Sequence, residues 1–382
     1  MFRVMIVGCG GIAPAHIEGY LHAEEGVHIT HLADQNTERA KALIQKYELR
    51  DVVAIADYRD GLACVDVVSV CTPPGLHCEV AVAALESGCH VLLEKPMAPS
   101  LAACDAMIAA AEKQGRLLSV VAQSRYISSI RNVIDMVRSG EYGRSLYTRI
   151  HSVWYRGESY YHLDWRGRWE VEGGGCTLNH SIHHIDLLLW AKGMPSCVRA
   201  FMTNLSHHNS EEEDFSSAML RYADGSVAEI TSSLICHGEQ QSLAFQMEKA
   251  GLAIPFQAFA SRARENGFPE TDEAQIAAAI ADYESRPKLA LENHDGQVQN
   301  FLRAITAREP LMVTAQDGRN SIELITGIYQ SAIQEREVCF PIAQDSAYYT
   351  DAWRAHAPHF FEKTTEVAAF QDTTITSFKD KF

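Results

Sequence analysis

Several features that would mark other classes of protein are missing from this sequence. Its ten cysteines stand singly with no C-x-x-C pair, so neither a disulfide framework nor a cysteine zinc site is indicated. No apolar run approaches the roughly 20 residues of a membrane-spanning helix, and the N-terminus does not resemble a signal peptide. We therefore expect a protein of the cytoplasm, where thiols stay reduced.

Positive charge is also scarce. The 33 basic residues are outnumbered by 49 acidic ones, which gives a formal net charge of −16. This excess argues against a nucleic acid or an anionic membrane as partner. The 47% of hydrophobic residues is ordinary for a globular protein, and 382 residues exceed one compact domain, so two domains are expected.

The first third of the chain alternates short apolar runs with segments of helical period. The runs are apolar on both faces, as parallel strands covered on both sides are. We therefore predict a doubly wound α/β (Rossmann) domain over residues 1–123. Strands are expected at Val4–Val7, His28–Ala33, Val52–Ile55 (weak), Val67–Cys71, His90–Leu93 and Leu117–Ala122, and helices at Ala13–Ala23, Glu38–Tyr47, His77–Ser87 and Leu101–Gln114.

The pattern changes after Ser124, and we predict a second, α+β domain over residues 124–382. Alternating runs and a hairpin turn at residues 223–226 indicate a mostly antiparallel sheet. Residues 251–293 have no clear pattern, and the tail from about Pro341 is expected to wrap the domain or form an oligomer contact. Expected helices are Ser128–Ser139, Thr177–Ala191, Gly296–Arg308 and Asp317–Gln334, and expected strands are Val198–Asn204, Ser216–Tyr222, Val227–Leu234 and Ser242–Glu248.

A glycine-rich turn follows the first predicted strand and opens the first predicted helix. It reads G-x-G-x-x-A, in which the first glycine permits a tight turn, the second lets a pyrophosphate approach the backbone, and the alanine keeps helix and sheet close. The phosphates would lie at the helix N-terminus, where free N–H groups favour an anion. The residues concerned are Gly8, Gly10, Gly11, Ile12 and Ala13.

Asp34 ends the second predicted strand, 24 residues after Gly10. A carboxylate there accepts hydrogen bonds from the adenosine ribose and repels a 2′-phosphate, and no Lys or Arg follows until Arg39. We therefore expect NAD rather than NADP. The alternative is that Asp34 only caps the helix that starts near Thr37.

Three further segments end predicted strands at the same edge of the sheet, where ligands bind in open α/β folds. Two prolines stiffen the first, the second carries a lysine able to hold a substrate hydroxyl or the nicotinamide ribose, and the third would lie near the nicotinamide. The glycine turn and the first two of these segments are three loops that converge on one rim, which favours a shared site. They are Thr72-Pro73-Pro74 with His77, then Glu94-Lys95-Pro96, and finally Gln123 with Arg125 and Tyr126.

These motifs, followed by the segment from Gly173 to Asp186 (GGGCTLNHSIHHID), resemble the glucose–fructose oxidoreductase/inositol dehydrogenase (Gfo/Idh/MocA) family. The match runs in order from residue 2 to about residue 335. The resemblance implies a Rossmann domain and a second domain with a large antiparallel sheet, through which many members form dimers or tetramers. It also implies hydride transfer at a carbinol carbon of a sugar, cyclitol or derivative.

The resemblance also implies roles for three residues. Lys95 matches the family's active-site lysine, and His183 matches its histidine, whereas the family's usual aspartate four residues earlier is here Asn179. An imidazole titrates near neutrality, so His183 is the candidate proton acceptor. Asn179, one helical turn earlier, can only contact the substrate or orient the imidazole.

Nearby side chains suggest other roles. His180, His183, His184 and Asp186 share helix faces in pairs, but no H-E-x-x-H pattern supports a metal, and hydride transfer needs none. The segment Trp154–Trp169 is dense in aromatic residues and arginines, and we expect Trp165 and Arg166 to contact the substrate; a strand edge or oligomer contact is an equal alternative. A non-catalytic sugar or dinucleotide sensor and a dehydrogenase of a non-sugar cyclic diol remain alternative functions.

Overall fold

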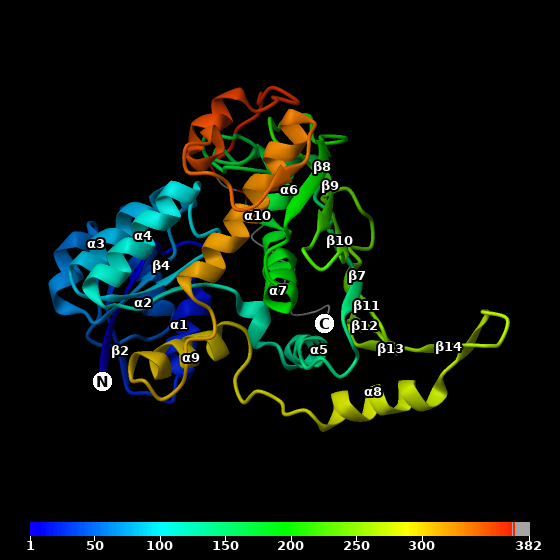
Figure 1. Cartoon of the computed structure of the whole chain (residues 1–382). Coiled ribbons are helices and arrows are strands. Elements are labelled where there is room, and N and C mark those ends of the chain that lie inside the picture. The colour runs from blue at the N-terminus through cyan, green and yellow to red at the C-terminus, as the bar shows by residue number, and fades with distance from the viewer. Residues whose placement is uncertain (369, 371–382) are drawn as a thin grey trace. The chain divides into compact units, whose positions relative to one another are not determined.

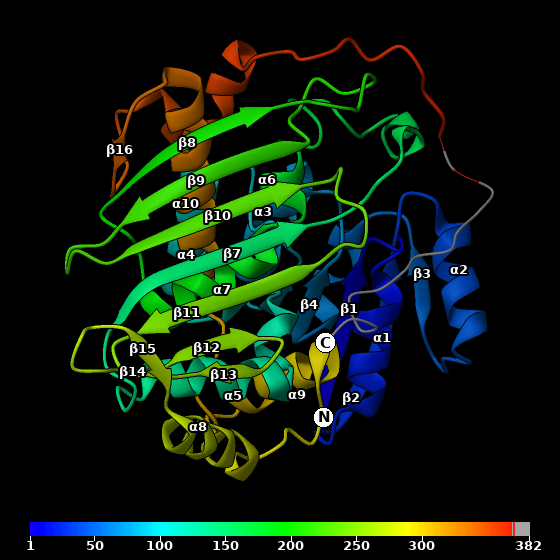
Figure 2. The same ribbon diagram turned by 90° about the vertical axis from the view of Figure 1, so that its right-hand side faces the viewer.

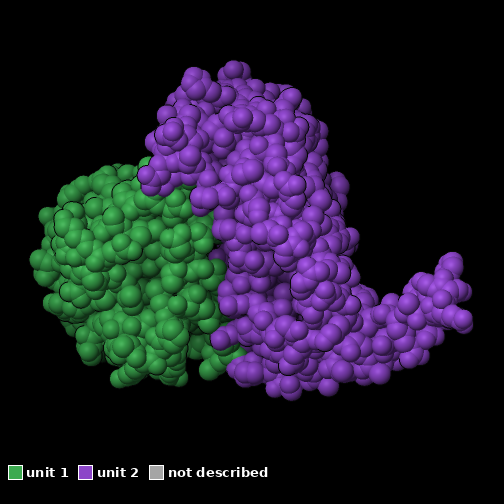
Figure 3. Space-filling model, viewed as in Figure 1, with its two compact units in different colours: residues 1–127, 289–322 green, residues 128–288, 323–382 purple. Residues whose placement is uncertain are grey.

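The structure is a computed structural model that describes residues 1–368 and 370. It divides the chain into two compact units, coloured separately in Figure 3. Unit 1 comprises residues 1–127 and 289–322, and unit 2 comprises residues 128–288 and 323–382. The predicted division at 123/124 therefore misplaced residues 289–322, which return to the first unit.

Unit 1 is built on a six-stranded parallel sheet in the order β3-β2-β1-β4-β5-β6. The strands and helices of its first 127 residues are blue to cyan in Figure 1. The strand order reverses between β1 and β4, where ligands of doubly wound folds bind. The strands are β1 (Phe2–Val7), β2 (Val27–Ala33), β3 (Val53–Ile55), β4 (Val67–Val70), β5 (His90–Leu93) and β6 (Leu118–Val120), joined through α1 (Ala13–His22), α2 (Thr37–Lys46), α3 (His77–Glu86) and α4 (Leu101–Gln114).

The returning segment completes the core of unit 1. Its helix α9 (Asn293–Ile305) packs against α1. Val298, Phe301 and Leu302 are at most 1% exposed and share a core cluster with Ile17 of α1. These apolar side chains explain why a segment so late in the chain belongs to the first unit.

Unit 2 is built on an eight-stranded sheet in the order β13-β12-β11-β7-β10-β9-β8-β16, shown face-on in Figure 2. Only β10 and β7 pair in parallel, so the sheet is mostly antiparallel, as predicted. The strands are β7 (Ser145–Val153), β8 (Cys197–Thr203), β9 (Phe215–Arg221), β10 (Val227–Ser233), β11 (Gln241–Met247), β12 (Gly251–Ile254), β13 (Gln257–Phe259) and β16 (Val338–Cys339).

Within unit 2, α6 (Cys176–Asn179) and α7 (Ile182–Lys192) lie behind this sheet in Figure 2, and α5 (Ser128–Arg138) contacts both α7 and β12. Residues 251–293, which had no clear pattern, form β12, β13, a small hairpin and α8. That helix and the hairpin strands are α8 (Glu273–Ser285), β14 (Ser261–Ala263) and β15 (Pro269–Thr271); α10 (Ala315–Gln334) runs from unit 1 into unit 2.

One prediction about unit 2 changes, and the tail follows one of its two expected alternatives. The single helix expected over Thr177–Ala191 is divided into α6 and α7, because the chain turns at residues 180 and 181. The tail wraps its own unit: Trp353 is 5% exposed, and its ring lies 5.7 Å from the rings of both Trp169 and Tyr329. Part of the tail, residues 369 and 371–382, lies outside the described residues.

Candidate active site

The glycine turn after β1 has the geometry that its sequence predicts. Gly8 has φ +95°, and a Cβ built on it would lie 2.6 Å from the carbonyl oxygen of Cys71. Only glycine tolerates both the left-handed backbone and this contact with the chain after β4. Ala13, the first residue of α1, is fully buried.

The space in front of the turn is open. A Cβ built on Gly10 or Gly11 finds no atom of the described residues within 4 Å. Ile12 is the N-cap residue of α1, and no side chain caps that helix. The first turn of α1 therefore keeps the room and the polarity that a pyrophosphate requires.

Asp34 is tied to this turn. Its Oδ2 accepts a hydrogen bond from the Cys9 N–H at 2.9 Å, and its Oδ1 accepts one from the Asn36 N–H at 2.8 Å. The helix α2 is capped by Asn36, which accepts from the Glu38 N–H. The alternative that Asp34 serves only as the helix cap is therefore wrong, and the carboxylate is held beside the fingerprint.

His77 joins two of the predicted loops. Its Nδ1 lies 2.9 Å from the Pro96 carbonyl oxygen, and its Nε2 lies 2.8 Å from the Thr72 carbonyl oxygen. The side chain is fully buried, and burial lowers the pKa of His77 against the opposing effect of the two carbonyl groups. The prediction that His77 contacts the cofactor is thus corrected to a positioning role, since the ring has no exposed surface.

Two oxygens on the rim fit a bound cofactor. Thr72 Oγ1 and Gln123 Oε1 are buried and have no hydrogen-bond partner among the residues that the structure describes. Buried polar atoms almost always have partners, and the amide and ribose hydroxyls of a nicotinamide nucleotide supply donors of this kind. Pro73 is exposed beside them, and Lys95 is half-buried at the end of β5.

Arg125 and Tyr126 do not face a substrate, contrary to our expectation. Arg125 is 1% exposed and donates to Asp317 Oδ1 at 3.1 Å, and Tyr126 is 2% exposed and donates to Asn300 Oδ1 at 3.0 Å. Both side chains hold the returning segment within unit 1. The position of Arg125 and Tyr126 just after the last strand did not reveal these contacts, because the partner residues lie about 180 residues further along the chain.

The histidines of unit 2 point in different directions. His183 is half-buried, whereas His180 lies 3.5 Å from Tyr160 Oη and His184 Nδ1 lies 2.7 Å from Ser152 Oγ. Burial lowers the pKa of His184 to about 4, so that ring is neutral at physiological pH. His183 is the candidate with a partly accessible imidazole.

Asn179 does not lie one regular helical turn before His183, because the helix is interrupted between them. Its Nδ2 donates to the carbonyl oxygen of Gly174, whose φ is +157°. The structure therefore gives Asn179 a contact that shapes the glycine loop, and its contact with the imidazole of His183 stays a prediction.

Trp165 and Arg166 lie side by side in unit 2. The Trp165 side chain is 40% exposed, and the guanidinium of Arg166 lies 4.1 Å from the centre of its ring. Arg166 also donates to Glu172 Oε1 at 2.6 Å. The charge of Arg166 is therefore already compensated inside the unit, and its guanidinium lies over the partly exposed indole.

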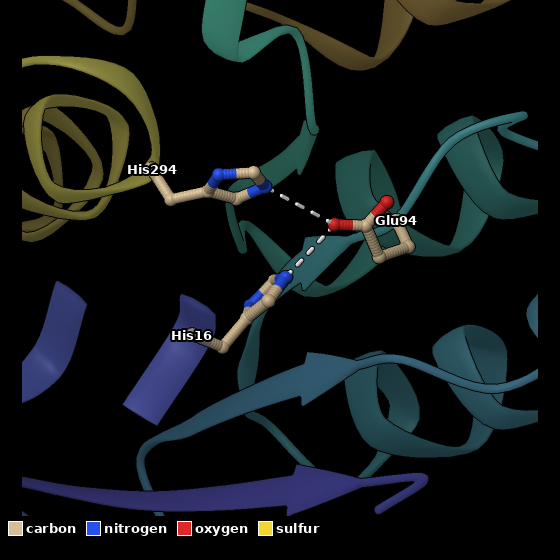
Figure 4. A group of neighbouring side chains, drawn as sticks. All are labelled: His16, Glu94 and His294. Carbon is tan, nitrogen blue, oxygen red and sulfur yellow. Dashed lines mark hydrogen bonds and ion pairs between the residues drawn. The ribbon is translucent and has the colours of Figure 1, made fainter. Parts of the chain in front are cut away.

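Sequence reasoning missed two histidines of unit 1. His16 Nε2 lies 2.9 Å from Glu94 Oε1, and His294 Nε2 lies 3.6 Å from the same oxygen (Figure 4). Glu94 is 6% exposed, so it does not offer its carboxylate to the cofactor as we expected. The sequence offered a clue for His16, which stands three residues after Ala13 of the glycine fingerprint, whereas no motif pointed to His294.

A parallel sheet in this strand order, with a glycine turn and an acid held beside it, defines a nicotinamide-dinucleotide oxidoreductase. Residues 2–122 match the family described as an oxidoreductase family with an NAD-binding Rossmann fold, and residues 130–253 match the GFO/IDH/MocA C-terminal domain. The chain belongs to the Gfo/Idh/MocA family of NAD-binding dehydrogenases.

Several similar proteins are named as dehydrogenases. D-glucoside 3-dehydrogenase of Escherichia coli is 23% identical over 86% of this chain and 95% of its own, and inositol 2-dehydrogenase of Salmonella typhimurium is 29% identical over 48% and 53%. The WlbA dehydrogenase of Bordetella pertussis, solved with NADH and UDP-GlcNAcA, is 25% identical, with TM-score 0.75 over 90% of this chain and 99% of its own. Within the described residues, no helix is long and apolar enough to cross a membrane.

Proposed function

We propose that this protein oxidises or reduces a carbinol carbon of a sugar, a cyclitol or a derivative, with NAD as the hydride carrier. The proposal rests on the glycine turn, which the hydrogen bond from the Cys9 N–H to Asp34 holds in place. It rests also on two buried oxygens of the same rim, Thr72 Oγ1 and Gln123 Oε1, which have no hydrogen-bond partner among the described residues. The substrate class rests on similarity to dehydrogenases of glucosides and inositol.

Oxidation of a carbinol removes a hydride from carbon and a proton from the hydroxyl. NAD, when bound, accepts the hydride. We assign the proton to His183, because an imidazole is half-protonated near neutral pH and can take and return a proton. Its neighbour His184 is fully buried and stays neutral, which leaves His183 as the group for this task.

Lys95 has a different role in the proposal. Its ammonium donates a hydrogen bond to the reacting oxygen and stabilises the negative charge that grows there as the proton leaves. The backbone on both sides of Lys95 is anchored, because its N–H donates to Glu94 Oε2 at 3.1 Å and the Pro96 carbonyl contacts His77. A cation on an anchored backbone needs little reorganisation during the reaction.

Two residues of unit 2 complete the assignment. Trp165 presents an exposed aromatic face, on which the C–H face of a sugar ring packs well. Because Arg166 is already paired with Glu172, we favour a neutral sugar or cyclitol over an anionic one. Asn179 supports the site by holding the glycine loop through Gly174.

A panel of sugars and cyclitols with NAD, followed by nicotinamide absorbance, tests the proposal. We expect turnover of at least one neutral polyol, loss of turnover in Lys95→Ala, and unchanged turnover in Lys41→Ala, whose lysine pairs with Glu38 on the surface of α2. NADH binding without turnover of any compound would contradict the proposal and favour a sugar or dinucleotide sensor.

We also propose a homodimer or homotetramer in the cytoplasm. The face of the eight-stranded sheet carries exposed apolar side chains, among them Phe201 at 62% and Met219 at 48%, beside a groove of about 650 Å³. Exposed apolar patches on a sheet mark interaction surfaces, and ten free cysteines suit a reducing compartment. Light scattering of the wild type and of Phe201→Lys would test the assembly, which should dissociate in the variant.

A further inference from the structure

Three side chains from distant parts of the sequence meet inside unit 1. His16 comes from α1, Glu94 follows β5, and His294 comes from the first turn of α9. Figure 4 shows both imidazoles directed at one carboxylate oxygen, with Nε2···Oε1 distances of 2.9 Å for His16 and 3.6 Å for His294. His16 is fully buried, Glu94 is 6% exposed, and the His294 side chain is 16% exposed.

A chain of hydroxyl groups fixes the outer end of this cluster. His16 Nδ1 lies 3.2 Å from Ser69 Oγ, which lies 2.7 Å from Tyr20 Oη. If Tyr20 donates to Ser69 and Ser69 donates to Nδ1, the proton of His16 is on Nε2 and points to Glu94. Every nitrogen of His16 then has a partner, and the tautomer of the ring is set by its neighbours.

On its other side, the cluster contacts the backbone of Lys95 through Glu94. Glu94 Oε2 accepts the Lys95 N–H at 3.1 Å, and on the other side the Pro96 carbonyl is held by His77 at 2.9 Å. The lysine therefore lies between two positions that buried histidines hold. Its freedom to shift along the rim of the sheet depends on these contacts.

The same three ligand atoms lie within 4.8 Å of one another, which raises the question of a metal ion. A tetrahedral zinc ion with ligands about 2.0–2.1 Å away would space them about 3.3 Å apart. The 2.9 Å contact between His16 and Glu94 is shorter and has the length of a direct hydrogen bond. The geometry favours a hydrogen-bonded network over a metal site.

We propose that His16, Glu94 and His294 form a positioning network for Lys95, in which an ionised Glu94 holds the lysine backbone. The inference rests on the proposed function, because it assigns Lys95 to the reacting oxygen. His16 and His294 touch neither substrate nor cofactor in this proposal; they act through Glu94. The returning segment thereby supplies a residue on which turnover depends.

Because the proposed network needs an ionised Glu94, its effect on turnover should depend on pH. Burial raises the pKa of Glu94, but the hydrogen bonds from His16 and His294 and the electrostatic attraction of their rings outweigh it and hold that pKa well below its usual value. Cys71 and His77 also interact electrostatically with this carboxylate, and Lys95 donates its backbone N–H to it. Loss of one imidazole should therefore let burial dominate and raise the pKa of Glu94.

The test compares three variants in the full-length protein. His294→Ala removes one donor at a partly exposed site, His294→Gln keeps an amide donor, and His22→Ala is the matched control. His22 also joins α1 to α9, through Asp295 at 2.8 Å, but its side chain is 56% exposed and it has no contact with Glu94. For each variant we would measure kcat, the KM for NAD, and the acid limb of the kcat profile.

We expect His294→Ala to lower kcat by about tenfold to a hundredfold, with little change in the KM for NAD. In the reduction with NADH, where a protonated His183 supplies the proton and adds no acid limb of its own, activity should be lost as pH falls through the pKa of Glu94. The acid limb of that reaction should move to higher pH in His294→Ala and move back in His294→Gln. The control should match the wild type. An unmoved acid limb would overturn the network, and so would a wild type whose activity needs a metal that chelators remove.

The inference can fail separately from the proposed function. If the wild type turns over and His294→Ala behaves like His22→Ala, only the network is refuted. If the wild type oxidises no compound, carbon-13 NMR of labelled glutamate, assigned with Glu94→Gln, still reads the carboxyl titration. A Glu94 pKa that His294→Ala leaves unchanged would then refute the network directly.

Discussion

Replacement of Gly8 by alanine should damage the fold before it damages cofactor binding. The new Cβ would lie 2.6 Å from the Cys71 carbonyl oxygen, and alanine would have to adopt φ +95°. A left-handed backbone costs a residue with a Cβ about 1–2 kcal/mol, and overpacking against fixed backbone costs about 1–3 kcal/mol. We therefore expect Gly8→Ala to lower the free energy of unfolding by about 2–5 kcal/mol.

Gly10→Ala is the control, because a Cβ there finds no atom of the described residues within 4 Å. Urea denaturation of the apoprotein should place Gly10→Ala within about 0.5 kcal/mol of the wild type, while titration with NADH should show a loss of affinity of at least about tenfold, since the methyl group occupies the approach of the pyrophosphate. If Gly8→Ala is as stable as the wild type, or if Gly10→Ala binds NADH normally, the reasoning about this turn is refuted.

Four further predictions concern single side chains. NAD should bind at least about tenfold more tightly than NADP, because Asp34 meets the 2′-phosphate of NADP; Asp34→Ser should narrow the difference in fluorescence titrations, and equal affinities in the wild type would contradict it. Lys95→Ala should keep the thermal unfolding midpoint but lower kcat by about a hundredfold or more; near-normal turnover would make Lys95 structural. In the wild type, oxidation should rise with pH through the range in which an imidazole titrates and then plateau, and His183→Asn should abolish that rise; an unchanged profile would exclude His183 as the base. Burial lowers the pKa of His184 to about 4, so the contribution of the neutral ring to the free energy of unfolding is complete above the unfolded pKa near 6.5 and is lost as pH falls toward 4. Urea denaturation should therefore show a smaller loss of stability over this range in His184→Gln than in the wild type, and an equal loss would refute the assignment.

Local patterns in the sequence were sufficient for residues 1–122 of the first unit. The strands there are short and mostly apolar and the helices lie between them, so the alternation predicted these strands and helices to within a few residues. The glycine turn and Asp34 were predicted for the same reason. Backbone conformation and the end of a strand are properties of a few consecutive residues.

Tertiary contacts decided the features that local patterns missed. The helix predicted over Thr177–Ala191 reads as one apolar segment, yet the chain turns at residues 180 and 181, where Ser181 Oγ donates to Ser232 Oγ at 2.6 Å. Likewise, Arg125 is committed to Asp317, a partner that no spacing rule connects to it.

The sequence by itself determined the family and the cofactor, because these depend on residue types in short motifs, and from the same motifs we proposed Lys95 and His183 for the chemistry. Only the tertiary structure showed that residues 289–322 belong to the first unit and that His294 reaches Glu94. The physical reason is that burial and hydrogen-bond partners depend on segments about 200 residues apart, which pack together through apolar faces such as that of Phe301 and leave no periodic signal of their pairing.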